Sequence, residues 1–188
     1  MGKYTHSDQD AWRWTKARAQ DVPEIVQLVD ANYSVEIDEV IFKKNPTRLS
    51  YHLHRAILDQ TYNLTTQNIS IARDIETNQL IAWAWIERGK YMVYADEELA
   101  VAEFSHVALN LPLRTRMTLT AQTIEIWIAW CELHKIPVLC STSIRAEQAG
   151  FMRLHDQYGF VRRGSFAYRR INAIGIPGAI QPPQGELI

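Results

Sequence analysis

The stretch "VALNLPLRTRMTLTAQ", residues 107–122, combines the end of a strand, a loop with two arginines and the start of a long helix. A helix N-terminus attracts anions because its first N–H groups have no partner within the helix. An arginine can hold a phosphate through two parallel hydrogen bonds, and this loop contains Arg114 and Arg116. Phosphate loops built on backbone N–H groups use glycine to let the anion approach, yet no glycine occurs between Lys90 and Ala149. The segment therefore predicts either an arginine-dependent phosphate site or a loop with a structural role only.

The strand before this loop contains Glu103 and His106. A carboxylate on a central strand can act as a general base if burial raises its pKa. Strand alternation predicts that Glu103 shares a face with Ser105 and Val107, and that His106 points to the other face. Glu103 is thus a candidate base or a carboxylate at the rim of the sheet. His106 fits a packed or surface histidine better than a catalytic one.

These residues need a sheet and helices to position them. Alternation and turn signals predict strands at residues 11–19, 67–89 as a hairpin, 98–110, 136–143 and 160–171. Apolar stripes, caps and breakers predict helices at residues 21–33, 45–62, 117–135 and 145–159. The order β-α-α-β-β-β-α-β-α-β indicates a mixed α/β (α+β) fold with a strand meander.

Length and composition favour one globular domain. The chain has 188 residues, of which 47% are hydrophobic. Residues 1–10 are predicted to form an N-terminal arm, 11–172 the domain, and 173–188 a tail rich in Pro and Gly. The expected core strand at 136–143 contains Cys140, and Cys131 precedes it in a helix. Two cysteines predict reduced core thiols and are too few for a zinc site of the cysteine type.

Bulk charge excludes some partners. The formal net charge is −1, so no global field attracts nucleic acid or an anionic membrane. The start of the chain has no apolar signal segment and no apolar run is long enough to span a bilayer. We therefore expect a cytoplasmic protein, or a virion-associated one if it is encoded by a phage, with no membrane or nucleic-acid partner and no bound metal.

Three segments together resemble the GCN5-related N-acetyltransferase (GNAT) fold. They are "WTKARAQDVPEIVQLV" near the start, "AEFSHVALNLPLRTR" in the centre and "FMRLHDQYGFVRRGSFAYRRI" near the end. The order of elements extends the likeness over nearly the whole chain. The matching residues are Glu103, Phe104, Val107, Leu109, Pro112, Arg114, Gly159 and Phe160.

The resemblance implies a mainly antiparallel sheet flanked by helices, and acyl transfer from acetyl-CoA to an amine. Acetyl-CoA would lie between the fourth and fifth strands, with its pyrophosphate on the helix that follows the fourth strand. Glu103 would be the general base, and His155 would protonate the leaving thiolate. The residues implied to contact acetyl-CoA are Val107, Leu109, Arg114, Arg116, Thr118, Ala121 and Gln148.

The sequence has one extra residue before Pro112 and departs from this family at three further positions. In the register that matches Arg116 and Ala121 to the family's loop, Leu119 stands where the key glycine is expected and would place a branched side chain in the path of the phosphate. His155 replaces the usual tyrosine, and the alternative is an exposed helix residue. Gln148 stands where the family often has an asparagine.

Two functions remain open at this point. The first is an N-acyltransferase that acts on an amine-bearing small molecule or protein. The second is a non-catalytic protein with the same fold in a larger assembly. A short likeness of the closing segment to an acetyltransferase-like protein of T7-type phages suggests a virion as its setting. The second function predicts protein partners for the arm and the tail, and an oligomer or assembly subunit.

Overall fold

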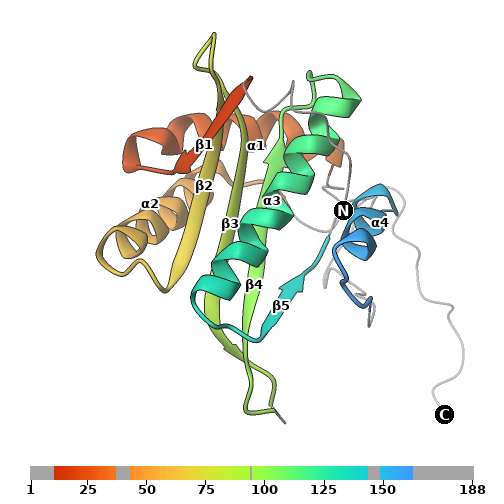
Figure 1. Ribbon diagram of the computed structural model, residues 1–188. Helices are drawn as coiled ribbons and strands as arrows, with labels where there is room; N and C mark the ends of the chain where they lie inside the picture. Colours follow the sequence, from red (N-terminus) through yellow and green to blue (C-terminus); the bar gives the residue numbers. More distant parts are fainter. Residues whose placement is uncertain (1–10, 37–42, 94, 144–148, 163–188) are drawn as a thin grey trace, which may run out of the picture.

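A five-stranded sheet forms the centre of the protein (Figure 1). The computed structural model describes residues 11–36, 43–93, 95–143 and 149–162. The strands are β1 (Trp12–Lys16), β2 (Gln67–Asp74), β3 (Leu80–Tyr91), β4 (Glu98–Val107) and β5 (Val138–Ser141). They lie in the order β1-β2-β3-β4-β5; the first four are antiparallel to their neighbours and β5 is parallel to β4. The prediction of a mixed, mainly antiparallel sheet is confirmed.

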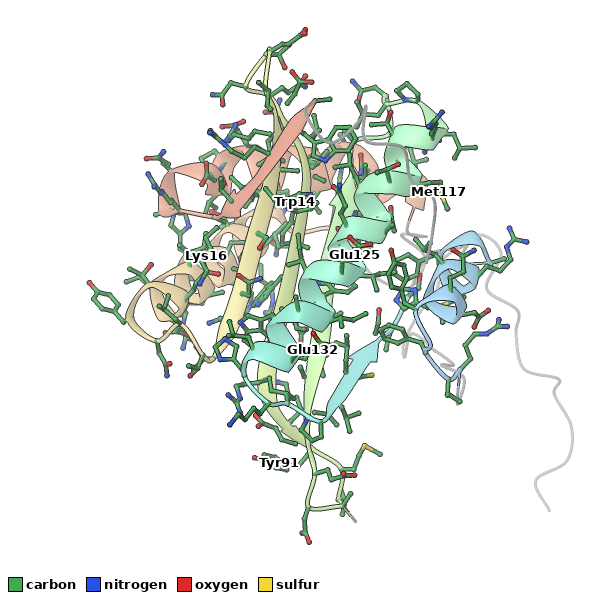
Figure 2. All side chains as sticks on the ribbon, in the orientation of Figure 1. Trp14, Lys16, Tyr91, Met117, Glu125 and Glu132 are labelled. Carbon is green, nitrogen blue, oxygen red and sulfur yellow. The ribbon has the colours of Figure 1, made fainter. Side chains whose placement is uncertain are left out.

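Helices cover both faces of this sheet (Figure 1). They are α1 (Val22–Glu36), α2 (Pro46–Tyr62), α3 (Leu113–Leu133) and α4 (Ala149–Gln157). Neighbouring residues of β3 point to opposite faces of the sheet and belong to different hydrophobic cores. Trp83 packs with Ile25 and Leu53 under α1 and α2. Ala84 packs with Ile124 under α3. The exposed Glu125 and Glu132 follow the outer side of α3 (Figure 2). A cavity lies between β4, α3 and α4, where β5 no longer pairs with β4.

Local signals explain where α2 begins. The Asn45 Oδ1 atom accepts a hydrogen bond from the Arg48 N–H at 2.9 Å, and Pro46 occupies the first turn, where its missing N–H costs nothing. Before α1, Asp21 accepts from the Arg18 N–H at 2.7 Å and from Arg73 at 2.8 Å. The second contact attaches the start of α1 to β2.

Several boundaries differ from the predicted ones. Helix α3 begins at Leu113 rather than at residue 117, because the chain is already helical directly after Pro112. Strand β5 is the last strand of the sheet among the described residues and is partly exposed rather than buried, with Val138 39% exposed. The predicted arm, tail and most of the last strand lie outside the described residues. Within the described ranges, no helix is long and apolar enough to cross a membrane.

Gln60 connects α2 to the first two strands. Its Nε2 donates to the Ala17 carbonyl at 3.1 Å and its Oε1 accepts from the Ile69 N–H, at a site where Gln60 is 3% exposed.

We expect Gln60→Ala to lower the free energy of unfolding by about 2–4 kcal/mol, because two buried backbone groups lose their partners. Urea unfolding measures this loss. Gln27→Ala, at an exposed position of α1, should change stability by less than about 0.5 kcal/mol. Equal losses in both variants would contradict the role given to Gln60.

Candidate active site at the divergence of β4 and β5

Strands β4 and β5 pair over four residues and then separate. Leu99 to Ala102 pair with Val138 to Ser141, and β4 continues to Val107 with β3 as its partner. Beyond Ala102, the side of β4 away from β3 faces a cavity of about 160 Å³. Residues from β4, the first turns of α3 and α4 line this cavity, among them Ser105, Val107, Leu109, Arg116, Thr120 and Phe151.

Backbone N–H groups of β4 face this cavity. The Ala108 N–H donates to the Ile81 carbonyl at 2.8 Å and so points to β3. In an antiparallel ladder the polar groups of successive residues point to opposite sides, so those of Val107 and Ser105 point away from β3. The Val107 carbonyl accordingly accepts from Asn32 Nδ2 on α1, at 2.8 Å. Among the described residues, Val107 therefore offers a fixed backbone donor on this side of β4, which could polarise a carbonyl group.

A β-bulge changes the direction of Glu103. Trp85 pairs with Phe104 while its neighbour Ile86 pairs with Ala102, which leaves Glu103 as an extra residue in β4. Glu103 is consequently hydrogen-bonded to Glu87, which follows Trp85 by two residues on the α1 and α2 face of β3.

His106 lies on that same face. Its ring stacks on Trp83 and Phe104, at centroid distances of 6.2 and 6.0 Å. The alternation expected for Glu103 was therefore wrong: it shares a face with His106 and not with Ser105 and Val107. His106 is also 2% exposed, which fits the packed histidine expected from its sequence context.

The surroundings of Glu103 favour its protonated form. Burial raises its pKa most, the negative charge of Glu87 and the hydrogen bond to it raise it further, and Lys90 opposes them; together they give a pKa of about 7. Lys90 forms an ion pair with Glu87 at 2.6 Å. Cys140 lies close enough for Glu103 to contribute, after burial, to a raised thiol pKa. A carboxyl with a pKa near 7 is suited to accept a proton at neutral pH.

The start of α3 offers an anion site. Pro112 occupies the N-cap position without a side-chain cap, and the first N–H to bond back to it is that of Arg116, at 3.0 Å. The amides before it have no acceptor within the helix. Arg116 lines the cavity, and its buried Nε has no hydrogen-bond partner among the described residues. Arg114 is exposed in the first turn. A phosphate group would supply the acceptor that Arg116 Nε lacks.

The other predicted loop residues lie in the helix and not in the cavity. The Thr118 hydroxyl donates to the Arg114 carbonyl at 3.1 Å, and Ala121 packs in the core under α3. Leu119 is 0% exposed and packs against the sheet with Trp12 and Ile81. The expectation that Leu119 obstructs a phosphate path was wrong, because the early start of α3 turns this residue toward the sheet. Gln148 lies outside the described residues.

His155 is buried, whereas the alternative expected from the sequence was an exposed helix residue. It is 1% exposed, with Nε2 at 2.9 Å from Ser141 Oγ and Nδ1 at 2.9 Å from the Phe151 carbonyl. Its ring lies between Phe151 and Phe160, at centroid distances of 4.4 and 4.7 Å. His155 thus connects α4 to the last paired residue of β5 and does not line the cavity.

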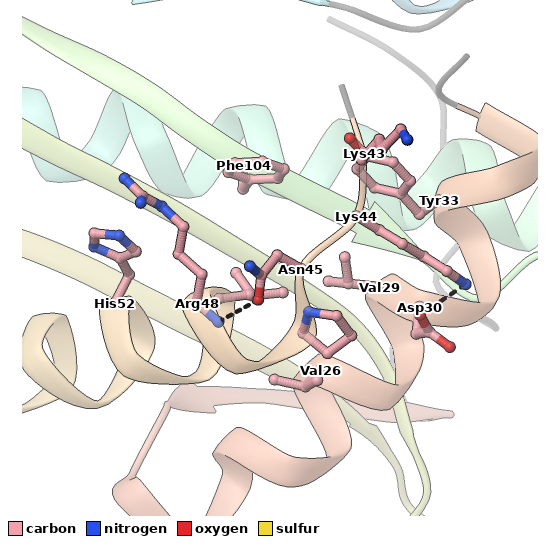
Figure 3. A pocket seen from close by; sticks show the side chains of 12 residues that line it. Val26, Val29, Asp30, Tyr33, Lys43, Lys44, Asn45, Arg48, His52 and Phe104 are labelled. Atoms are coloured by element: carbon pink, nitrogen blue, oxygen red, sulfur yellow. Dashed lines mark hydrogen bonds and ion pairs between the residues drawn. The ribbon is translucent and has the colours of Figure 1, made fainter. Parts of the chain in front are cut away.

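A second cavity lies on the opposite face of β4. It has a volume of about 390 Å³ and is enclosed by α1, α2 and Phe104 (Figure 3). Because Phe104 lines this cavity and Ser105 lines the first, the two cavities flank the same segment of β4. The sequence contained no signal for this cavity, since the cavity forms only when α1 and α2 pack together beside Phe104 of β4.

Solved structures share this architecture. An aminoglycoside antibiotic 6'-N-acetyltransferase from Acinetobacter baumannii aligns with a TM-score of 0.59 and 13% identity over 86% of this chain and 98% of that one. A glucosamine-6-phosphate N-acetyltransferase from Arabidopsis thaliana aligns with a TM-score of 0.61 and 9% identity, over 86% of this chain and 99% of that one. An aminoglycoside N-acetyltransferase in complex with CoA aligns with a TM-score of 0.62 and 12% identity, over 86% of this chain and 95% of that one. No protein-family model matches the sequence, and no curated protein matches it.

The chain therefore has the fold of the GCN5-related N-acetyltransferases. At these identities the likeness shows the fold, and the chemistry depends on the residues of the site itself.

The burial of Leu119 can be tested directly. We expect Leu119→Ala to lower the free energy of unfolding by about 2–5 kcal/mol, because it leaves a void between α3 and the sheet. Leu133→Ala, at a site on the same helix where the side chain is 74% exposed, should cost less than about 0.5 kcal/mol. Similar stabilities for both variants in chemical unfolding would show that Leu119 does not pack in the core.

The raised pKa of Glu103 predicts a pH-dependent stability. The folded state holds this proton more tightly than the unfolded chain, so the stabilisation is complete below the usual pKa of 4.5 and is lost as pH rises through about 7. Between these values, Glu103→Gln should flatten the fall in stability, measured by thermal unfolding at a series of pH values. Glu97 is exposed, so Glu97→Gln should show the same dependence of stability on pH as the unsubstituted protein. An unchanged slope in Glu103→Gln would refute the assignment.

Proposed function

We propose that the protein is an acyltransferase that moves an acyl group from acetyl-CoA to an amine. The observation that carries this proposal is the divergence of β4 and β5. It brings the N–H group of Val107 and the buried Nε of Arg116 to a single cavity. A thioester needs the first feature, because a fixed donor stabilises the oxyanion that forms on its carbonyl. A CoA pyrophosphate needs the second.

Each residue has a role in this proposal. The α3 N-terminus, Arg116 and the exposed Arg114 bind the pyrophosphate. Val107 supplies a backbone N–H to the thioester carbonyl, and Leu109 contacts the apolar part of the cofactor. Glu103, with a pKa of about 7, removes the proton of the attacking amine. Thr118 and Ala121 support the helix from inside rather than contact the ligand.

The fate of the leaving thiolate involves His155. Its Nε2 is hydrogen-bonded to Ser141, the last β5 residue before the strands separate. A proton from His155 would therefore reach the thiolate through the Ser141 hydroxyl. This relay replaces direct protonation by His155, which its burial disfavours.

The named structures support this choice, since each is an acetyltransferase and one contains CoA. The alternative of a non-catalytic component in a phage or other assembly had four grounds: the glycine-free loop, the missing tyrosine, the many tryptophans and the tail rich in Pro and Gly. The burial of Leu119 in the core removes the obstructed loop from these grounds. Protein partners for residues 1–10 and 173–188 remain a prediction from the sequence.

Calorimetric titration with acetyl-CoA tests the proposal. We expect a micromolar Kd, about −8 kcal/mol, and release of free CoA thiol when an acceptor amine is added. Arg116→Ala should weaken binding by about tenfold or more, because it removes charge-assisted hydrogen bonds to the pyrophosphate.

Arg13→Ala is the matched control, since Arg13 is exposed on β1, at the other end of the sheet order. Its affinity should equal that of the unsubstituted protein. An absence of heat at millimolar acetyl-CoA would contradict the proposed function, and equal affinities in the two variants would contradict the role of Arg116.

A further inference from the structure

The cavity between α1, α2 and β4 has an apolar floor. Val26, Val29, Leu49 and Phe104 all belong to or pack on the core beneath these helices. The Phe104 ring is held in place by stacking on Trp83, with the centroids 6.1 Å apart and the planes 11° from parallel. A fixed flat ring and branched aliphatic side chains favour an apolar ligand body.

Positive charge surrounds this floor. Lys43, Lys44 and Arg48 line the cavity, and Asp30 is the one carboxylate among its described lining residues. Asp30 pairs with Lys44 at 2.9 Å, so no carboxylate of this lining balances Lys43 and Arg48. The whole chain has a formal net charge of −1, so this local excess is not a consequence of overall composition.

The charges have a definite arrangement (Figure 3). The Lys44–Asp30 pair lies at one end of the cavity and Arg48 lies with His52 at the other. Arg48 and His52 are four residues apart on α2 and so share a helix face. The positive end of α2 lies between the ion pair and these two side chains and next to Arg48, since Asn45 and Pro46 line the cavity there. An anionic group at this end would meet two side-chain donors and a favourable helix dipole.

We infer that this cavity holds the acceptor substrate, and that the acceptor is a small amine with an apolar body and an anionic group, either a carboxylate or a phosphate. The inference rests on the proposed function for the amine and on the cavity itself for the other two features. The anion lies at Arg48, the apolar body lies on Phe104 and Leu49, and the amine points along β4 toward the first cavity. A volume of about 390 Å³ suits a small molecule. A polycationic amine is disfavoured by repulsion from Lys43 and Arg48.

Matched pairs of amines test this assignment. L-phenylalanine and 2-phenylethylamine differ in a carboxylate, whereas glucosamine 6-phosphate and glucosamine differ in a phosphate. Kanamycin serves as the polycation. Binding is measured by calorimetry in the presence of CoA and again in its absence, and turnover is measured by thiol release from acetyl-CoA. We expect the anionic member of at least one pair to bind about tenfold or more tightly than its partner, and more weakly as salt is raised.

Arg48→Gln should abolish this preference, because the anionic group of the ligand loses its charge-assisted hydrogen bonds. The cap hydrogen bond uses the backbone N–H of Arg48, so the variant keeps the start of α2. Arg55→Gln, at an exposed position of the same helix outside the cavity, should retain the preference.

Equal binding within both pairs, no binding of either anionic amine at millimolar concentration, or tightest binding of kanamycin would overturn the inference. Selective binding of an anionic amine without thiol release would support the cavity's specificity and contradict the acyltransferase function. Thiol release without discrimination within the pairs would do the reverse.

Discussion

The separation of β5 from β4 after four residue pairs is the constraint on which the site depends. A central strand normally has both edges satisfied by neighbouring strands. Here the edge of β4 beyond Ala102 must find other partners. Asn32 Nδ2 donates a hydrogen bond to the Val107 carbonyl, and residues of α3 and α4 line the cavity beyond the end of β5. The direction of the Val107 N–H is set by the β3 ladder, so this donor stays in position without the adjustment that a loop would need.

The bulge at Glu103 provides the second part of the arrangement. Regular alternation counted back from Val107 and Ser105 would place Glu103 on the α3 face. The bulge instead places it beside Glu87, and burial together with this carboxylate keeps its pKa near 7. Lys90 limits the effect by pairing with Glu87. The geometry of one backbone irregularity thus determines both the direction of the carboxylate and its proton affinity.

Most of the fold follows from local patterns, whereas much of the site does not. The hairpin of β2 and β3 and the Asn45-Pro46 start of α2 have signals within a few residues, and both were predicted. The bulge has no such signal, because it arises from pairing with β3. The burial of His155 depends on Ser141 and Phe160, which approach it only in the folded chain. The position of Leu119 depends on where α3 begins. The helix starts at Leu113, four residues before the predicted start at residue 117, and this earlier start directs Leu119 into the core.

An anion site without glycine is consistent with this early helix start. Glycine matters where an anion lies against the backbone of a loop; at a helix terminus the free N–H groups point along the axis, past the side chains. Arg116 then adds a charge that a glycine loop does not have. Arg48 lines the cavity on the opposite face of β4 from Arg116, so the two anionic groups of the proposals occupy separate cavities. Phe104 and Ser105 of β4 separate the two cavities, and Glu103 directly precedes them. In the proposed function, an amine from one cavity and a thioester from the other meet beside this segment.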